Sequence, residues 1–314
     1  MHSSPLISVV TPSFNQAQFL EETLRSVERQ RYRPIQQIVI DGGSSDGTVD
    51  LLKRWEAQNH GDGYTFEWIS ERDRGHADAL NKGFDRVRGD IVGWLNSDDV
   101  YFDTRVITDT VSVFQEHPDV DVVHGEVALI TEDSGLQMIL CYPQFRYQRA
   151  LRGFMLSQPA LFLRRIVTDT HRLDPSLKIA IDHVYWLQIG KQHKFRKLNR
   201  ILAGDRDHCA RITRMSHQAL MEASRKACSA YGARNAGRFE RLSDLVLLRL
   251  LRVDGLLHLL SLLSRGKSMG DLAFPGWIDS VPNVLRRQLL MRVNNRGNAG
   301  PTRHVTSDVP NMAR

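Results

Sequence analysis

Short apolar segments and amphipathic helical segments alternate through the first hundred residues, and this alternation constrains the fold more than any other feature of the chain. Four segments have the β-branched, apolar composition of buried strands: 6–11, 37–40, 66–70 and 90–95. Apolar residues between them recur at the spacing of a helix face, over 19–27, 49–55 and 77–87. Strands joined by helices of this length form right-handed βαβ units, so the sequence predicts an α/β fold with a parallel sheet.

Each predicted strand is followed by a polar loop, and three of the four loops are acidic. The loops are Thr11–Asn15, Asp41–Asp46, Asp73–His76 and Asn96–Asp99. The carboxyl ends of parallel strands share one edge of the sheet, which is where open α/β sheets bind ligands. Turn chemistry explains any one of these loops. Four polar loops at one edge indicate a binding site.

The rest of the chain continues less regularly. We expect a helix over 104–118, a β-hairpin of 120–130 and 136–142 around Asp133-Ser134-Gly135, a short helix near Tyr147, a strand at 160–163, a helix over 180–192 and a strand at 198–203. Beyond residue 212 the pattern is helical, and 245–263 suits an amphipathic helix. We therefore predict a domain over 1–210, divided near residue 100 into a ligand-binding half and a mixed half. A helical extension over 211–293 and a disordered tail over 294–314 follow.

Composition excludes several classes of protein. The 314 residues include three cysteines that are far apart and form no C-x-x-C, which argues against a disulfide framework and a cysteine zinc site and favours a cytoplasmic protein. No signal peptide and no transmembrane segment are expected. No G-x-G-x-x-G follows a strand and no P-loop occurs, which disfavours hydride-transfer and phosphoryl-transfer enzymes.

Positive charge is concentrated at the C-terminal end. From Cys209 onward there are 17 Lys+Arg and 7 Asp+Glu, whereas the remainder of the chain is acidic. Such a segment suits an anionic membrane surface, an acidic glycan or nucleic acid, or is simply a solvated helical surface. It lacks interleaved aromatic residues and any known nucleic-acid motif, so no nucleic-acid partner is expected. We expect a cytoplasmic protein whose basic C-terminal helices contact the inner face of the membrane peripherally.

The loop Asn96-Ser97-Asp98-Asp99 places two adjacent carboxylates where a buried strand ends. Mg²⁺ and Mn²⁺ prefer oxygen ligands, and Mg²⁺ is often held by one or two carboxylates together with substrate phosphates. An aspartate-rich turn that caps the next helix is the alternative interpretation.

Five ordered motifs closely resemble glycosyltransferase family 2: Val9-Val10-Thr11-Pro12-Ser13-Phe14-Asn15, Ile40-Asp41-Gly42-Gly43-Ser44-Ser45-Asp46-Gly47-Thr48, Ser70-Glu71-Arg72-Asp73-Arg74-Gly75, Asn81-Lys82-Gly83, and Gly93-Trp94-Leu95-Asn96-Ser97-Asp98-Asp99. The resemblance covers about residues 5–210. It implies a GT-A-like fold, in which a Rossmann-like, mostly parallel central sheet is flanked by helices, here with a C-terminal helical extension. It also implies an inverting transfer of sugar from a nucleoside-diphosphate donor, with a UDP-sugar expected, to a glycan or lipid-linked acceptor.

The resemblance assigns roles residue by residue. The nucleotide-sugar contacts would be Thr11, Pro12, Asn15, Asp41, Asp73, Arg74, Asn96 and Ser97. Two departures stand out: Gly42 replaces the second acid of the usual Asp-Asp-Gly-Ser, and Asn96 replaces the first acid of the D-x-D motif.

The remaining roles concern metal and catalysis. Asp98 would bind Mn²⁺ or Mg²⁺ with Asp99 as an auxiliary ligand, and His208 resembles a position that approaches the metal or diphosphate. Asp182, in Ile181-Asp182-His183, resembles the general base that takes the acceptor proton; helix capping is the alternative from local chemistry alone. The sequence thus predicts a metal-dependent glycosyltransferase of cell-surface polysaccharide or glycolipid synthesis. A non-catalytic sugar-nucleotide or glycan-binding module on the same fold is the alternative.

Overall fold

The computed structural model describes residues 4–209, 211, 217–234 and 237–264. Its N-terminal half is a parallel sheet in the order β3-β2-β1-β4, formed by β1 (Ile7–Ser13), β2 (Ile35–Asp41), β3 (Tyr64–Ser70) and β4 (Ile91–Trp94). All four predicted strands are confirmed, with ends shifted by one or two residues. Their carboxyl ends lie along one edge, so the four polar loops do share one edge of the sheet.

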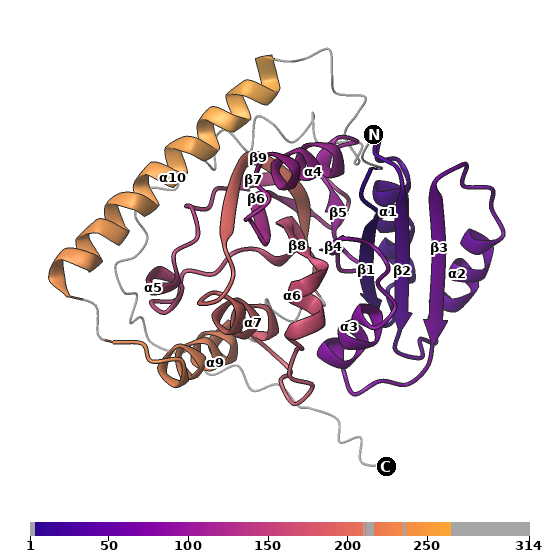
Figure 1. Cartoon of the computed structure of the whole chain (residues 1–314), viewed down its shortest axis with the longest axis horizontal. Helices are drawn as coiled ribbons and strands as arrows, with labels where there is room; N and C mark the ends of the chain where they lie inside the picture. Colours follow the sequence, from indigo (N-terminus) through magenta and orange to yellow (C-terminus); the bar gives the residue numbers. More distant parts are fainter. Residues whose placement is uncertain (1–3, 210, 212–216, 235–236, 265–314) are drawn as a thin grey trace, which may run out of the picture.

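Helices cover both faces of this parallel half. Alternate residues of β2 separate the two cores, because successive strand side chains point to opposite faces. Val39 packs with α1 (Ala17–Glu28) and α2 (Thr48–Glu56), whereas Ile38 and Ile40 pack with α3 (His76–Phe84) on the other face. In Figure 1, α2 lies beside β3, and α3 lies against β1 and β2, which it contacts.

The second half extends the same sheet in mixed orientation. β8 (Leu161–Arg164) pairs antiparallel with β4 and with β6 (Val122–Thr131), and β9 (Phe195–Asp207) pairs parallel with β6. β5 (Val100–Tyr101) pairs with β9, and β7 (Leu136–Leu140) completes the predicted hairpin with β6. The expected mixed character of this half is confirmed.

One predicted boundary is wrong in a way that concerns function. The last strand was expected at 198–203, but β9 continues to Asp207 because its pairing with β6 runs as far as Thr131 opposite Asp207. Asp205 and Arg206 are therefore strand residues with fixed directions and not loop residues. Three short elements escaped prediction: β5, the 3₁₀ turn Gln158–Ala160, and helix α6 (Arg165–Thr170).

The remaining helices lie around the second half. They are α4 (Val106–Glu116), α5 (Tyr147–Ala150), α7 (Ile181–Ile189), α9 (His217–Ala230) and α10 (Arg238–Ser264). α9 contacts α7, and α10 packs along β7 at the edge of the molecule (Figure 1). Among the described residues, no helix is both long and apolar enough to cross a membrane. The predicted tail over 294–314 and the part of the predicted extension after Ser264 lie outside the described residues, and the predicted domain boundaries stay predictions.

Candidate active site

The loop after β4 is fixed in place by its own side chains and by α1. The Asn96 side-chain oxygen accepts a hydrogen bond from the Trp94 indole at 2.9 Å. Ser97 is buried, and its carbonyl accepts a hydrogen bond from the Thr23 hydroxyl at 2.9 Å. Ser97 therefore shapes the loop, and its neighbours Asn96 and Asp98 are the partly exposed members.

Asp98 is the carboxylate of this loop that reaches the surface. Its side chain is 20% exposed, and its Oδ2 atom lies 3.0 Å from Nε2 of the buried His208. The His208 ring in turn packs on Phe19 of α1, with ring centroids 4.8 Å apart. The structure thus brings together the two predicted metal-site residues that are farthest apart in sequence.

Asp99 points inward. It is buried, and its Oδ1 atom accepts a hydrogen bond from the backbone amide of Arg206 at 3.0 Å. Burial raises the pKa of the Asp99 carboxyl well above its ordinary value, and the nearby carboxylates of Asp98 and Asp205 add to that rise. Asp99 therefore belongs to a group of three neighbouring acids and also holds the β4 loop against β9.

Arg206 is a buried cation beneath this loop that the sequence did not reveal. Its guanidinium donates to the Asp98 carbonyl at 2.9 Å, to the Ser134 hydroxyl at 2.8 Å and to the Glu132 carbonyl at 2.8 Å, and it pairs with Glu22. Buried charge is tolerated only with such complete pairing. Arg206 thereby joins α1, the β6–β7 turn and the loop that carries Asp98.

We expect the Asp99→Asn variant to be more stable than the wild type at neutral pH. Asparagine keeps an oxygen that accepts the hydrogen bond from the Arg206 amide, and it removes a carboxyl whose pKa is raised in the folded state. A carboxyl whose pKa is higher in the folded than in the unfolded state lowers the free energy of unfolding as the pH rises, and this loss is reversed as the pH falls. The gain should be on the order of 1 kcal/mol, or about 2–4 °C in Tm, and should narrow toward acidic pH. Thermal denaturation across pH, with the exposed Asp62→Asn as control, measures it; a lower Tm would contradict this account.

The loop after β2 is built around Asp41. Its buried carboxylate accepts hydrogen bonds from the amides of Gly43 at 3.1 Å and Ser44 at 2.9 Å, from the Ser44 hydroxyl and from the Ser70 hydroxyl at 2.6 Å. Asn15, with a positive φ of 52°, contacts the same loop: its side-chain oxygen accepts a hydrogen bond from the Ser45 amide at 2.9 Å. Asp41 therefore organises this part of the edge, while Asn15 is exposed at its rim.

The loop after β3 approaches the same point. A side chain on Gly42, where the family usually has a second acid, would place its Cβ only 2.7 Å from Asp73 Oδ2, so the Asp73 side chain would have to move. Arg74 is largely exposed and forms an ion pair with Asp78 at 2.7 Å. Thr11 and Pro12 are buried at the end of β1. The predicted nucleotide residues thus line one edge, with Asp73 near its centre and Arg74 at its outer rim.

His76 is a second residue that the sequence analysis assigned no role. It begins α3, and its ring lies 5.7 Å from the Trp94 ring. Burial lowers the pKa of His76, and the carboxylates of Asp98 and Asp73 oppose that decrease. His76 therefore lies between the β3 and β4 loops, and only the fold reveals this, since a lone histidine carries no motif.

Asp182 occupies the second residue of α7, after Ala180, which has a positive φ of 56°. Burial raises the pKa of its carboxyl; hydrogen bonding and the charge of His183 oppose the rise, and the Asp205 carboxylate contributes to it. Asp205 accepts a hydrogen bond from Ser157 at 3.1 Å and pairs with Arg211 at 2.5 Å. Through Asp205, the predicted base is electrostatically linked to Asp98 and Asp99.

The raised pKa of Asp182 predicts a shifted acid limb in the pH profile of sugar transfer. A general base acts only when deprotonated, so kcat should rise with pH through a midpoint above the ordinary aspartate value of about 3.9 and then level off. The Asp205→Asn variant should move this midpoint to lower pH, because removing a neighbouring negative charge lowers the pKa of Asp182. Initial rates across pH test both shifts; an acid limb at the ordinary value in the wild type would contradict the assignment.

The donor set at this edge suits a divalent cation held jointly with a diphosphate. Asp98, Asp99 and Asp205 lie close enough to one another for their negative charges to interact. The positive charge of Arg211 interacts with all three. Within the described part of the chain no cluster of three or more potential ligands is assembled. Asp98 and His208, 3.0 Å apart, are the residues at this edge that could contribute ligands, and an ion there would need further ligands, such as the oxygens of a bound diphosphate.

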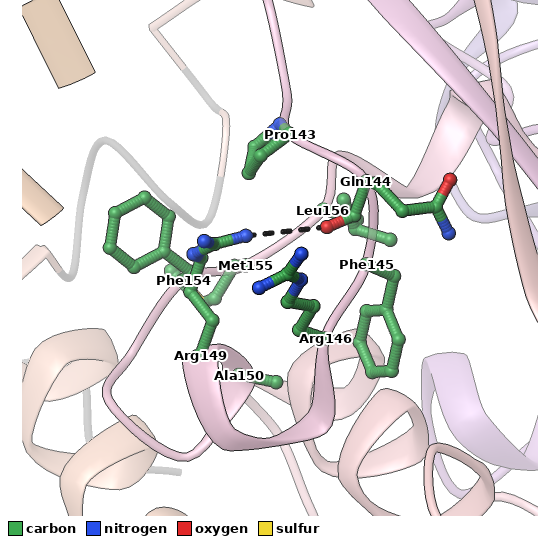
Figure 2. Close-up of a pocket in the computed structure, with 9 residues that line it drawn as sticks. All are labelled: Pro143, Gln144, Phe145, Arg146, Arg149, Ala150, Phe154, Met155 and Leu156. Carbon is green, nitrogen blue, oxygen red and sulfur yellow. Dashed lines mark hydrogen bonds between the residues drawn. The ribbon is translucent and has the colours of Figure 1, made fainter. Parts of the chain in front are cut away.

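Two hollows lie away from the strand ends. Figure 2 shows a small pocket formed by residues 143–156, where Arg149 lies 5.8 Å from the Phe154 ring and donates to the Gln144 carbonyl at 3.4 Å; none of the predicted site residues lines it. A cavity of about 250 Å³ lies beside the start of α7 and is lined by apolar and polar side chains: Arg172, Leu173, Asp174, Leu177, Ile181, Val184, Tyr185, Gln188 and Tyr231. This second hollow is lined by the residue that precedes Asp182 in the sequence.

Known proteins share these features. The model of the family described as Glycosyl transferase family 2 matches residues 8–171. An uncharacterised glycosyltransferase of Mycobacterium tuberculosis is 41% identical over 112 residues, covering 35% of this chain and 40% of that protein. A glycosyltransferase of Bacillus subtilis named for teichuronic acid biosynthesis, TuaG, is 26% identical over 189 residues, or 60% of this chain and 73% of that protein. The chain thus spans less than half of the mycobacterial relative.

Solved structures agree on the fold. TarS of S. aureus in complex with UDP-GlcNAc superimposes with a TM-score of 0.55 at 15% identity, over 73% of this chain and 68% of that chain. The mannosyltransferase of Pyrobaculum calidifontis in complex with GDP-Man and Mn²⁺ superimposes with a TM-score of 0.57 at 15% identity, over 84% and 76%. The GT-A-like fold is confirmed. Because the family model matches more than half of the chain, across β1 to β4 and the loops that follow them, the protein belongs to glycosyl transferase family 2.

Proposed function

We propose that the protein is an inverting, metal-dependent glycosyltransferase that moves a sugar from a nucleoside diphosphate to an acceptor hydroxyl. The observation that carries the proposal is the juxtaposition at one sheet edge of the partly exposed Asp98 carboxylate, hydrogen-bonded to His208, with the electrostatically linked Asp205 and Asp182. Asp98 suits binding of the donor diphosphate and its cation, and Asp182 suits removal of the acceptor proton. A purely structural acidic turn would not account for both.

The chemistry follows from these positions. Asp182 accepts the proton of the acceptor hydroxyl while that oxygen attacks the anomeric carbon. The bond between the anomeric carbon and the diphosphate oxygen breaks as the new glycosidic bond forms, so configuration inverts and the nucleoside diphosphate departs. Asp98 and His208 would hold Mn²⁺ or Mg²⁺, which neutralises the charge on the departing diphosphate. Arg206 keeps the Asp98 loop in position from below.

For the donor we propose a UDP-sugar. Asp41, Asp73, Asn15 and Asn96 surround the edge where the nucleotide would lie. One structural neighbour holds UDP-GlcNAc and another GDP-Man, and these bound ligands support the nucleotide-sugar class. Uracil is the base that the position of Asp41 favours by resemblance to the family.

For the acceptor we propose a growing polysaccharide or lipid-linked glycan at the inner face of the membrane. The name of the B. subtilis relative supports a cell-surface polymer. The cavity beside Ile181 offers two tyrosine rings for sugar faces and the polar side chains of Arg172, Asp174 and Gln188 for sugar hydroxyls, which suits a glycan acceptor.

A thermal-shift screen tests the donor proposal directly. UDP, GDP and their sugars would be added with and without Mn²⁺, since a ligand that binds the folded state raises Tm. We expect a UDP-sugar to raise Tm more in the presence of Mn²⁺ than in its absence. Failure of every nucleotide to raise Tm, with or without Mn²⁺, would overturn the proposal.

The alternative of a non-catalytic sugar-nucleotide or glycan-binding module makes a different prediction. Such a module binds donor but leaves the bond to the diphosphate intact. Release of nucleoside diphosphate in the presence of acceptor therefore separates the two. Asp182, half-buried at its helix start with a pKa that burial raises, favours the enzyme.

A further inference from the structure

Helix α10 is attached to the rest of the protein along one side. Figure 1 shows it running along the outer edge of the molecule, where it packs on β7. Arg152, just after α5, holds it with a two-pronged ion pair: Nε to Asp244 Oδ2 at 2.7 Å and Nη2 to Asp244 Oδ1 at 2.9 Å. Leu251 and Gly255 are buried against the protein on the same side. The inward side of α10 is therefore well defined.

The outward side of α10 carries a long apolar surface. Eight large apolar side chains of this helix are 43% to 82% exposed, and at 3.6 residues per turn all but Leu248 fall on the outward side: Phe239, Leu242, Leu245, Val246, Leu248, Leu250, Val253 and Leu257. They are eight of the eleven large hydrophobic side chains that are exposed in the described part of the chain. Contiguous exposed apolar area of this kind marks an interaction site.

Charge on α10 is sorted between the two sides. At 3.6 residues per turn, Arg249 falls among the outward apolar residues, and Arg241 and Arg252 fall along one flank. The carboxylates lie on the other side of the helix. Asp244 and Glu240 pair with Arg152. Burial raises the pKa of Cys141 just after β7, and the Asp254 carboxylate adds to that rise. The outward surface therefore combines apolar residues with positive charge.

We infer that the outward side of α10 lies on an anionic membrane surface, with its apolar residues among the lipid chains and its arginines at the headgroups. An apolar helix side with flanking basic residues suits this interface. A second copy of the chain fits poorly, because a symmetric contact across this side would bring Arg249 near its own equivalent. The 50 residues after Ser264 fit poorly as a cover too, since their 8 Lys+Arg against 3 Asp+Glu repeat the same sign.

The purpose of membrane binding rests on the proposed function, because an enzyme held at the membrane would meet lipid-linked acceptors in two dimensions. Binding itself can be measured without catalysis. Co-sedimentation of the full chain would use vesicles of phosphatidylcholine alone and of phosphatidylcholine mixed with phosphatidylglycerol. We expect binding to the mixed vesicles that weakens as salt is added.

Substitutions on α10 locate the surface. Arg249→Gln should weaken binding to mixed vesicles about five-fold, and Leu242→Ser combined with Leu250→Ser about ten-fold or more. The matched controls are Arg54→Gln on α2 and Ile166→Ser on α6, which remove an exposed cation and an exposed apolar side chain elsewhere. Circular dichroism and Tm should be unchanged in all four variants.

Three outcomes would overturn the inference. One is equal binding to the two vesicle types, and another is unchanged binding by both α10 variants. The third is a wild-type dimer in solution that the leucine variant converts to a monomer, which would assign the surface to a second copy. Donor turnover with a soluble acceptor should be the same in the α10 variants and the wild type, so failure of membrane binding is distinguishable from failure of the proposed transfer reaction.

Discussion

Replacing Asp182 by asparagine is expected to lower kcat for sugar transfer by about 10²–10⁴-fold while leaving donor affinity unchanged. The amide is nearly the same size as the carboxyl, so the start of α7 keeps its shape, but it cannot accept the acceptor proton. Asp182 lies at the start of α7, next in sequence to Ile181 of the proposed acceptor cavity, so we expect the nucleotide contacts at the strand ends to stay intact. Steady-state kinetics together with donor titration by calorimetry measure the two effects separately.

The matched control is Asp169→Asn. Asp169 is an exposed carboxylate on α6 that lies 3.8 Å from Arg165, and it does not line the cavity beside α7. This variant should keep nearly normal kcat. Normal transfer by Asp182→Asn would remove Asp182 as the base and leave helix capping as its role.

The second large effect is expected from Asp98→Ala, which should abolish the dependence of donor binding on Mn²⁺. Charge stabilisation by a bound cation is worth several kcal/mol, so turnover should fall by about 10²-fold or more. The fold should survive, because the Asp98 carbonyl still receives Arg206 and the Asp99 side chain still receives the Arg206 amide. Calorimetric titration of the nucleotide with and without Mn²⁺ gives a readout that does not depend on turnover.

His208→Ala should produce a weaker version of the same loss, since His208 shares the Asp98 carboxylate and packs on Phe19. The exposed loop variant Asp62→Ala serves as the control. If Asp98→Ala binds the nucleotide with its full response to Mn²⁺, the cation is held elsewhere and the metal assignment is wrong.

The parts that the sequence predicted well are those with a local physical signal. β1 to β4 came from β-branched composition and from the change between strand and helix spacing, and burial on both faces made that signal strong. The shared edge followed from topology. The position of Asp98 at that edge, close to His208, needed only the family resemblance and the order of the strands.

What the sequence could not provide depends on contacts between distant segments. Arg206 appeared as one more basic residue after a short strand, because nothing in its local sequence reveals that β9 continues and buries it beneath the Asp98 loop. Asp99 appeared as an auxiliary ligand because adjacent residues on a loop give no sign of which one points inward. His76 and the Arg152–Asp244 pair join segments whose proximity only the folded chain creates.

The most direct test of the proposed reaction is the anomeric configuration of the product. Proton NMR would follow the transfer of sugar from the nucleotide donor found in the thermal-shift screen, with the anomeric coupling constant of the new glycosidic bond compared with that of the donor. A single displacement with Asp182 as base predicts inversion, so an α-linked donor should give a β-linked product. A product that retains the donor configuration would contradict the account.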